Sequence, residues 1–335
     1  MSKKENEAYV GPLLKSEFDL LIKLAKKVLW SDLETREAIQ QHKLNITPVN
    51  FYSNIPSVAE VRESFEYRDT EEQTGSYFSE TIFSRERTLK FLNELRSYAN
   101  EFNPPLEKPA DNDEVFYWNN SSFSYMDAMS YYCIIRYCKP KRIIEIGAGN
   151  STLVANQALQ VNGAGDLVLI EPFLPEYLRN LKSITKTHEK IVQDFELEEL
   201  VSLVEEADIL FIDSTHTVKI GSDCLFIYLK LLPEITKKML VHAHDVFLPY
   251  AQPQSKIQNH IYWTEQYLLY AYLLDNPKTR ALTGSYFCHR QFPEISKELM
   301  GGKYGGWRRL LLVRTELRTL FSKESVLEHF RLHKE

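Results

Sequence analysis

The sequence is poor in glycine, in paired cysteines and in long apolar runs. It has 12 glycines in 335 residues, below the average usage of roughly 7%. None of its four cysteines forms a C-x-x-C pair, so neither a zinc ribbon nor a disulfide framework is indicated: Cys133, Cys138, Cys224 and Cys288. No apolar run approaches the ~18 residues that span a bilayer. The N-terminus turns acidic at Glu5 and Glu7, where a signal peptide would be apolar. These absences predict a cytoplasmic protein without a membrane span.

Acidic residues outnumber basic ones, 46 to 40. The formal net charge is −6 at neutral pH, which disfavours a broad surface for nucleic acid. Hydrophobic residues make up 44% and charged residues 26% of the chain, a balance typical of globular proteins. A chain of this length suggests two domains, or one large domain with an extension.

The hydrophobic pattern changes along the chain. Residues 13–29 and 84–102 have apolar residues at helical spacing, and prolines interrupt the segments that follow them. From about residue 140, short apolar runs alternate with helical patterns. We therefore predict three parts, which are a helical N-terminal extension, a main domain and a tail helix: 1–110, 111–320 and 321–335.

The main domain is predicted to be an α/β fold of the Rossmann-like type. Its apolar runs predict five strands: 142–146, 167–171, 190–194, 208–213 and 239–245. Helices are expected between them, including one over 174–184. Continuous apolar strands that alternate with helices indicate a parallel sheet covered on both faces. Residues 281–288 and 310–314 show no convincing helix between them, so they predict a closing antiparallel hairpin with the glycine-rich segment 301–306 in its loop.

Polar residues gather at the ends of these strands, where ligands bind in open parallel sheets. Each predicted strand has such a residue at its end or next to it: Glu145, Glu171, Asp194, Asp213 and the pair His244-Asp245. Gly147 and Gly149 follow the first strand, and glycine is favoured where a backbone approaches a ligand closely.

The glycine turn distinguishes between nucleotide cofactors. A dinucleotide fingerprint has the pattern G-x-G-x-x-G, but Thr152 stands at its third glycine. The segment from Glu145 to Ser151, Glu-Ile-Gly-Ala-Gly-Asn-Ser, instead resembles motif I of the class I S-adenosylmethionine-dependent methyltransferases. Ser151 replaces the third glycine that is frequent in that motif. The resemblance covers roughly residues 120–315.

The resemblance implies a site for S-adenosylmethionine that is lined by seven residues: Glu145, Gly147, Gly149, Ser151, Glu171, Asp194 and Asp213. Glu145 would face the ammonium group of the cofactor, and Glu171 would accept its ribose hydroxyls. Asp194, with Gln193, would meet the adenine amino group. Asp213 would lie under the sulfonium.

Further segments resemble the branch that includes the macrocin-type O-methyltransferases, whose uncharacterised members are associated with surface-glycan and secondary-metabolite genes. These segments are Phe211 to His216, Gly221 to Asp223, His242 to Asp245, Asn119 to Tyr125 and Phe51 to Pro56. The branch implies methyl transfer to oxygen more often than to nitrogen or carbon. The expected acceptor is a small molecule or a sugar with a hydroxyl group.

For a hydroxyl acceptor the enzyme supplies orientation and a base. Strands four and five are neighbours in this fold, so His216 and His244-Asp245 should converge beside the methyl group. His244 is the first candidate for the base and His216 the second. His242 shares the face of His244 but lies deeper, which indicates a structural role.

Several alternatives stay open at this point. A divalent metal could bind Asp213, His244 and Asp245, but hard cations prefer oxygen ligands, and this set offers few carboxylates, so metal dependence is favoured less. The chain could be a metal-dependent or NAD-linked oxidoreductase or hydroxylase on a similar sheet. It could also be a non-catalytic binding scaffold. Lys303 could close over the substrate, and assembly into a homo-oligomer is left open.

Overall fold

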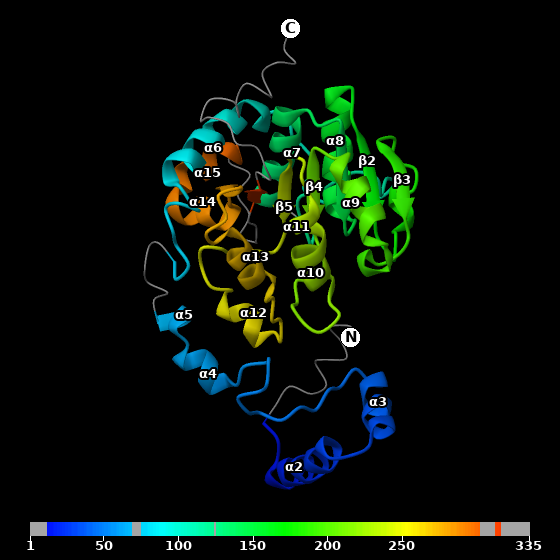
Figure 1. Ribbon diagram of the computed structural model, residues 1–335, viewed down its shortest axis with the longest axis vertical. Helices are drawn as coiled ribbons and strands as arrows, with labels where there is room; N and C mark the ends of the chain where they lie inside the picture. Colours follow the sequence, from blue (N-terminus) through cyan, green and yellow to red (C-terminus); the bar gives the residue numbers. More distant parts are fainter. Residues whose placement is uncertain (1–11, 69–74, 124, 302–311, 316–335) are drawn as a thin grey trace. The chain divides into compact units, whose positions relative to one another are not determined.

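A computed structural model describes residues 12–68, 75–123, 125–301 and 312–315 (Figure 1). The chain divides into two compact units, Met1–Ser64 and Phe65–Glu335. Lys303 and the tail helix predicted for 321–335 lie outside the described residues, and the three-part division made from the sequence stays a prediction. Within the described part of the chain, no helix is long and apolar enough to cross a bilayer.

The described part of the first unit, residues 12–64, consists of helices and their connections. It contains α2 (Lys15–Leu29), α3 (Leu33–Gln41) and α4 (Val58–Glu63), and none of these helices has a buried residue. α3 begins where the side chain of Asp32 accepts a hydrogen bond from the Thr35 amide. α4 begins at a capping box between Ser57 and Glu60. α2 confirms the helix predicted for 13–29.

The second unit is built on a seven-stranded sheet of order β3-β2-β1-β4-β5-β7-β6 (Figure 1). The strands are β1 (Arg142–Ile146), β2 (Asp166–Ile170), β3 (Ile184–His188), β4 (Ile209–Ile212), β5 (Leu240–Ala243), β6 (Thr279–Thr283) and β7 (Leu312–Thr315). β1 to β5 are parallel, while β7 pairs antiparallel with both β5 and β6. This confirms the predicted Rossmann-like sheet and its closing antiparallel pair.

Helices cover both faces of the sheet, because successive strand residues point to opposite sides. Ile143 and Phe211 pack into a core with α6, α7 and α8, whereas Ile144 and Ile212 pack into a second core on the other face. The helices of the second unit are α5 (Phe65–Arg68), α6 (Arg85–Ala99), α7 (Met126–Cys138), α8 (Asn150–Asn162), α9 (Leu197–Glu205), α10 (Asp223–Phe226), α11 (Leu232–Glu234), α12 (Gln254–Gln258), α13 (Glu265–Leu273), α14 (Ser285–Gln291) and α15 (Pro293–Leu299). A π-helical turn, Ile227–Leu231, joins α10 to α11.

Two sequence predictions are wrong in detail. The helix expected over 174–184 is a single 3-10 turn, Glu176–Leu178, that begins after Pro175, and the third strand is Ile184–His188. The strand expected at 190–194 is another 3-10 turn, Val192–Asp194. β3 is an edge strand with a polar, half-exposed sequence, so it lacks the apolar run that identified its neighbours.

The closing hairpin also differs from the prediction. α14 and α15 lie between β6 and β7, where no helix was expected, and the second half of the predicted strand 281–288 is helical. The short, strongly apolar sequence around Phe287 and Cys288 suits a buried helix as well as a strand, and periodicity alone does not separate the two.

Candidate functional site

The glycine turn after β1 lies against the end of β4. Gly147 has φ +90°, a conformation that favours glycine, and a Cβ atom added to it would lie 2.1 Å from the carbonyl oxygen of Asp213. Gly149 differs, since a Cβ atom there would meet no protein atom within 4 Å. The turn is also tied to β2, because the Ala148 amide donates to Glu171 Oε2 over 3.2 Å. Gly147 is therefore required by the fold, and the space beside Gly149 is open to a ligand.

Glu145 is fully buried beneath this turn. Its Oε1 accepts a hydrogen bond from the Tyr131 hydroxyl at 2.9 Å, and its Oε2 accepts one from the Thr152 hydroxyl at 2.6 Å. Thr152 Oγ1 in turn accepts from the Gly149 amide. Glu145 thus links α7, through Tyr131, to the start of α8, through Thr152, and so stabilises the turn from below.

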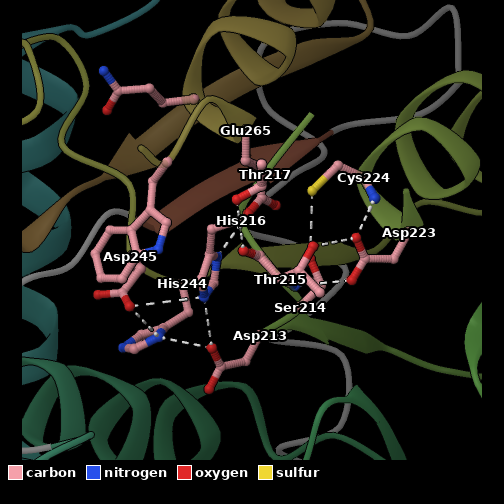
Figure 2. A network of polar contacts seen from close by, with 12 residues as sticks. Asp213, Ser214, Thr215, His216, Thr217, Asp223, Cys224, His244, Asp245 and Glu265 are labelled. Carbon is pink, nitrogen blue, oxygen red and sulfur yellow. Dashed lines mark hydrogen bonds and ion pairs between the residues drawn. The ribbon is translucent and has the colours of Figure 1, made fainter. Parts of the chain in front are cut away.

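Asp213 follows β4 and is the centre of a cluster of acids and histidines (Figure 2). Its Oδ1 lies 3.0 Å from His244 Nδ1 and 3.2 Å from His216 Nε2. Asp245 Oδ2 lies 3.7 Å from His216 Nε2 and 4.0 Å from His244 Nδ1. Asp213 exposes 33% of its side chain, against 8% for His216 and 3% for His244. The cluster is therefore reached from the side of Asp213.

Glu265, the first residue of α13, fixes the position of His216. Its Nδ1 lies 2.8 Å from Oε2 of Glu265, and the other oxygen of Glu265 accepts the hydroxyl hydrogen bond of Tyr228. The Glu265 amide donates to the carbonyl of His216. The Trp263 ring packs edge-on against His216, with 5.2 Å between the ring centroids. These contacts fix one imidazole nitrogen on Glu265 and direct the other to Asp213.

His244 is held between β4 and α7. Its amide donates to the carbonyl of Ile212, which places it at the end of β5. While its Nδ1 faces Asp213, its Nε2 lies 3.8 Å from Oδ2 of Asp127, a buried residue in the first turn of α7. Phe123 packs on the ring, with 5.1 Å between centroids. Both nitrogens of His244 therefore face carboxyl groups.

The loop that bears His216 is anchored by Asp223 (Figure 2). Asp223 accepts hydrogen bonds from the amide and the hydroxyl of Thr215, at 2.8 and 2.6 Å. It also accepts the amide of Cys224. His216 itself has φ +58°, which is uncommon for a residue other than glycine. The anchor thus stabilises the bend that turns His216 towards Asp213.

Comparison with known proteins points to one enzyme class. A family described as a methyltransferase domain matches residues 144–246, which include the glycine turn, Glu171 and the cluster from Asp213 to Asp245. An uncharacterized protein from Archaeoglobus fulgidus is 34% identical over 168 residues, which cover 47% of this chain and 73% of that protein. The chain is thus related to this archaeal protein, and its residues 144–246 are a methyltransferase domain.

Solved methyltransferase structures are similar to this chain at low identity. The O-methyltransferase from Bacillus cereus in complex with SAH is 15% identical, with 62% of this chain and 87% of that chain covered and a TM-score of 0.33. The O-methyltransferase TomG from Streptomyces achromogenes, in complex with SAM, is 14% identical, with 60% and 83% covered and a TM-score of 0.32.

The acids and histidines of the cluster in the methyltransferase shift one another's pKa values and so determine which of them are charged. Burial lowers the pKa of His216, but its hydrogen bonds to Asp213 and Glu265 raise that pKa to about 10. Burial also opposes the charge on His244, yet the carboxylates of Asp213 and Asp245 raise its pKa well above the ordinary value. Burial raises the pKa of Asp213, but the two histidines outweigh it and hold that pKa well below its usual range. At neutral pH both imidazoles are thus cationic and Asp213 is an anion.

The predicted residues fall into two groups in the methyltransferase. Asp213, His216, His244 and Asp245 come together in one cluster. Gly147, Glu171 and Ser151 gather around the neighbouring turn, with Ser151 buried in the first turn of α8. Asp194 stands apart, because it is exposed in a 3-10 turn rather than at a strand end. Which of these residues bind the cofactor or act in transfer stays a prediction.

Sequence reasoning missed the residues behind the histidines. Glu265 lies 49 positions from its partner His216, and Asp127 lies in a helix that precedes β1. Their carboxyl groups at first-turn positions are common helix features, so no local signal separated them from ordinary capping. His242, predicted to be structural, is buried between Tyr131 and Phe211.

A cavity of about 440 Å³ lies away from the cluster, along α8. Asn156, Gln157 and Asn180 are among its lining residues. None of the predicted site residues lines this cavity, so it does not locate the methyl-transfer site.

Proposed function

We propose that this methyltransferase transfers its methyl group to a hydroxyl oxygen of a sugar or another small molecule. The observation that supports this acceptor most is the exposed side of Asp213, next to the glycine turn and in front of two histidines. An alcohol that enters there meets a carboxylate that accepts its hydrogen bond. We further propose that the methyl donor is S-adenosylmethionine and that seven residues hold it: Glu145, Gly147, Gly149, Ser151, Glu171, Asp194 and Asp213.

Transfer from a sulfonium is an in-line displacement at an activated methyl group, so orientation supplies much of the rate. Asp213 is proposed to orient the acceptor hydroxyl, and His216, His244 and Asp245 are proposed to set the charge at that point. Two cationic imidazoles behind Asp213 stabilise negative charge that develops on an oxygen beside it. The oxygen–methyl bond forms as the sulfur–methyl bond breaks, the hydroxyl proton passes to the carboxylate of Asp213, and S-adenosylhomocysteine leaves.

The similarity to the macrocin-type branch supports a role in glycan or secondary-metabolite synthesis. A cytoplasmic location is part of the proposal, and it is supported by four free thiols.

The test uses S-adenosylmethionine labelled in its methyl group and a panel of sugars, nucleotide sugars, phenols and amines. We expect label in a base-stable ether for at least one hydroxylated acceptor, with S-adenosylhomocysteine formed in equal amount. Asp213→Asn should reduce the rate by 10²-fold or more, while the exposed control Asp111→Asn should leave it unchanged. Transfer to amines alone, or a base-labile ester, would contradict the proposal.

A further inference from the structure

The cavity of about 440 Å³ along α8 is lined mainly by polar side chains, most of which are carboxamides. Four segments of the second unit surround it, which are α8, the chain after α6, the chain before α7 and the connection that leads into β3. Eight of its fourteen lining residues are polar, with six carboxamides, one carboxylate and one ammonium group: Asn103, Asn112, Asn156, Gln157, Gln160, Asn180, Glu114 and Lys182. The volume lies within the ~300–1,000 Å³ range of small-molecule sites.

Helix α8 presents one face to the cavity. Each of its lining residues lies three or four positions from two others, which is the spacing of neighbours on a helix surface: Leu153, Asn156, Gln157 and Gln160. Asn156 is only 6% exposed, and its Oδ1 accepts a hydrogen bond from the Ser183 amide over 3.1 Å. Its Nδ2 group donates no hydrogen bond to another described residue. Both N–H donors of this buried amide are therefore available to an occupant of the cavity.

Three further amides at the cavity are unpaired. The side chains of Gln157, Gln160 and Asn180 form no hydrogen bond with another described residue. Gln157 is half-buried, while Gln160 and Asn180 are exposed. A single unpaired amide on a protein surface is ordinary, because water satisfies it. Here three such amides lie around one cavity together with the free donors of buried Asn156, and this convergence is typical of a polar ligand site.

We propose that this cavity binds a neutral sugar or a similar polyol, as a second ligand site separate from the methyl-transfer site. A carboxamide has N–H donors and an acceptor oxygen, and a hydroxyl group likewise donates and accepts hydrogen bonds. Several convergent amides therefore match a ligand that carries a hydroxyl group on most of its carbon atoms. The other lining residues are apolar and can pack against the C–H groups of a sugar ring: Pro104, Pro105, Val115, Phe116, Leu153 and Leu181.

The charges at the cavity favour a neutral ligand. Glu114 and Lys182 are its two charged lining residues, and both are exposed. Because their signs are opposite, a phosphate or carboxylate group would be attracted by one and repelled by the other. Anionic groups are often bound by the paired donors of arginine, and no arginine is among the described residues that line the cavity. The cavity thus lacks the positive charge that a nucleotide or a sugar phosphate requires.

The cavity and the turn after β1 are connected by two segments of the chain. α8 begins at Asn150, directly after Gly149, and its later residues line the cavity. The connection that carries Asn180 begins at Glu171, directly after β2. A sugar in the cavity and a ligand at the turn would thus contact different residues of the same two segments. The inference does not rest on the proposed function, because sugar binding is measured without a methyl donor.

The experiment is a titration of the full chain with glucose, galactose, N-acetylglucosamine and maltose, followed by calorimetry and by saturation-transfer NMR. We expect at least one of these neutral sugars to bind with a Kd of about 1 mM or lower. Glucose 6-phosphate should bind no more tightly than glucose. Hydrogen exchange in the presence of the bound sugar locates the site, and exchange should slow in residues 103–116 and 180–184 but not in residues 213–216.

Variants on the exposed side of α8 test the amides without disturbing the core. Gln157→Ala and Gln160→Ala should each weaken sugar binding by about 3- to 10-fold, the equivalent of one hydrogen bond. Gln157→Trp should abolish binding, because the indole fills the cavity. Alanine is the strongest helix former, so both alanine variants should keep their fold, which thermal denaturation verifies. Gln41→Ala, an exposed change at the end of α3, is the matched control and should bind as the wild type does.

The inference is overturned if none of the four sugars binds, or if glucose 6-phosphate binds at least about 10-fold more tightly than glucose, which would indicate a phosphate site. It is also overturned if both alanine variants and Gln157→Trp bind the sugar as the wild type does. Slowed exchange in residues 213–216 alone would place the sugar at the methyl-transfer site. That result would overturn this inference and support the proposed function, whereas sugar binding in the cavity without any methyl transfer to a hydroxyl would count against the proposed function alone.

Discussion

Gly147 lies so close to Asp213 that a methyl group on Gly147 would stand 2.1 Å from the Asp213 carbonyl oxygen. The turn after β1 and the end of β4 are thus in direct contact. This contact places the proposed cofactor turn beside the acid and histidine cluster, so that a methyl donor and an acceptor can meet between them.

The two glycines of the turn should respond differently to alanine. Gly147→Ala forces a Cβ atom against the backbone of Asp213 at φ +90°, so we expect a loss of several kcal/mol of stability or failure to fold. Gly149→Ala meets no protein atom within 4 Å, so stability should change by less than about 1 kcal/mol. Its cofactor affinity should fall, because the new methyl group occupies ligand space. Chemical denaturation and calorimetric titration of both variants test this, and equal effects on stability would contradict it.

Glu171 is expected to bind the ribose of the cofactor. Its two oxygens accept the amides of Ala148 and Phe173, and a carboxylate has about four acceptor positions, which leaves room for hydroxyl groups. Glu171→Ala should weaken S-adenosylmethionine binding by about 10- to 100-fold, the equivalent of a hydrogen bond to a charged group. Glu176→Ala, an exposed change in the same connection, is the control. Unchanged affinity in Glu171→Ala would remove this residue from the cofactor site.

Glu145 should make stability depend on pH. Burial raises its pKa from 4.5 to about 7, against the hydrogen bonds from Thr152 and Tyr131 that lower it, while Asp213 raises it further. Between pH 4.5 and 7 the folded protein keeps a proton that the unfolded chain releases, so the free energy of unfolding falls as pH rises. Glu145→Gln has no ionisable carboxyl group at this position, so it lacks this contribution to the pH dependence of stability.

The stability of Glu145→Gln relative to wild type should therefore increase by about 3 kcal/mol between pH 4.5 and 8. Urea denaturation of both proteins at several pH values measures this difference. A difference that stays constant across the window would show that Glu145 ionises in the folded protein as it does in the unfolded chain.

Asp223 is predicted to act through the loop that it anchors. Asp223→Ala removes two hydrogen bonds to Thr215 and one to Cys224, and we expect a loss of about 2 kcal/mol of stability. Because the loop that bears His216 loses its anchor, methyl transfer should slow, whereas S-adenosylmethionine binding should stay within about twofold. Asp111→Ala serves as the control. Unchanged stability and an unchanged transfer rate in Asp223→Ala would show that these hydrogen bonds do not anchor the loop.

The central sheet could be predicted from the sequence because its inner strands are continuous apolar runs. β1 was predicted with its observed bounds, 142–146, since both faces of it are buried. β3 was missed, because an edge strand with the sequence Ile-Thr-Lys-Thr-His has no such run. α14 was missed because a short buried helix and a short strand can have the same apolar content.

Only those residues of the cluster that follow neighbouring strands could be predicted from the sequence. The ends of β4 and β5 are adjacent in any sheet of this type, so Asp213 and His244 were expected to meet. Glu265 and Asp127 reach the histidines through helix packing across long sequence separations. That packing depends on the whole core, and no local pattern encodes it.

Calorimetric titration with S-adenosylmethionine, S-adenosylhomocysteine and NAD⁺ tests the account most directly. The account predicts one site per chain for S-adenosylmethionine, competition by S-adenosylhomocysteine, and no heat of binding with NAD⁺. Binding of NAD⁺ without binding of S-adenosylmethionine would contradict it.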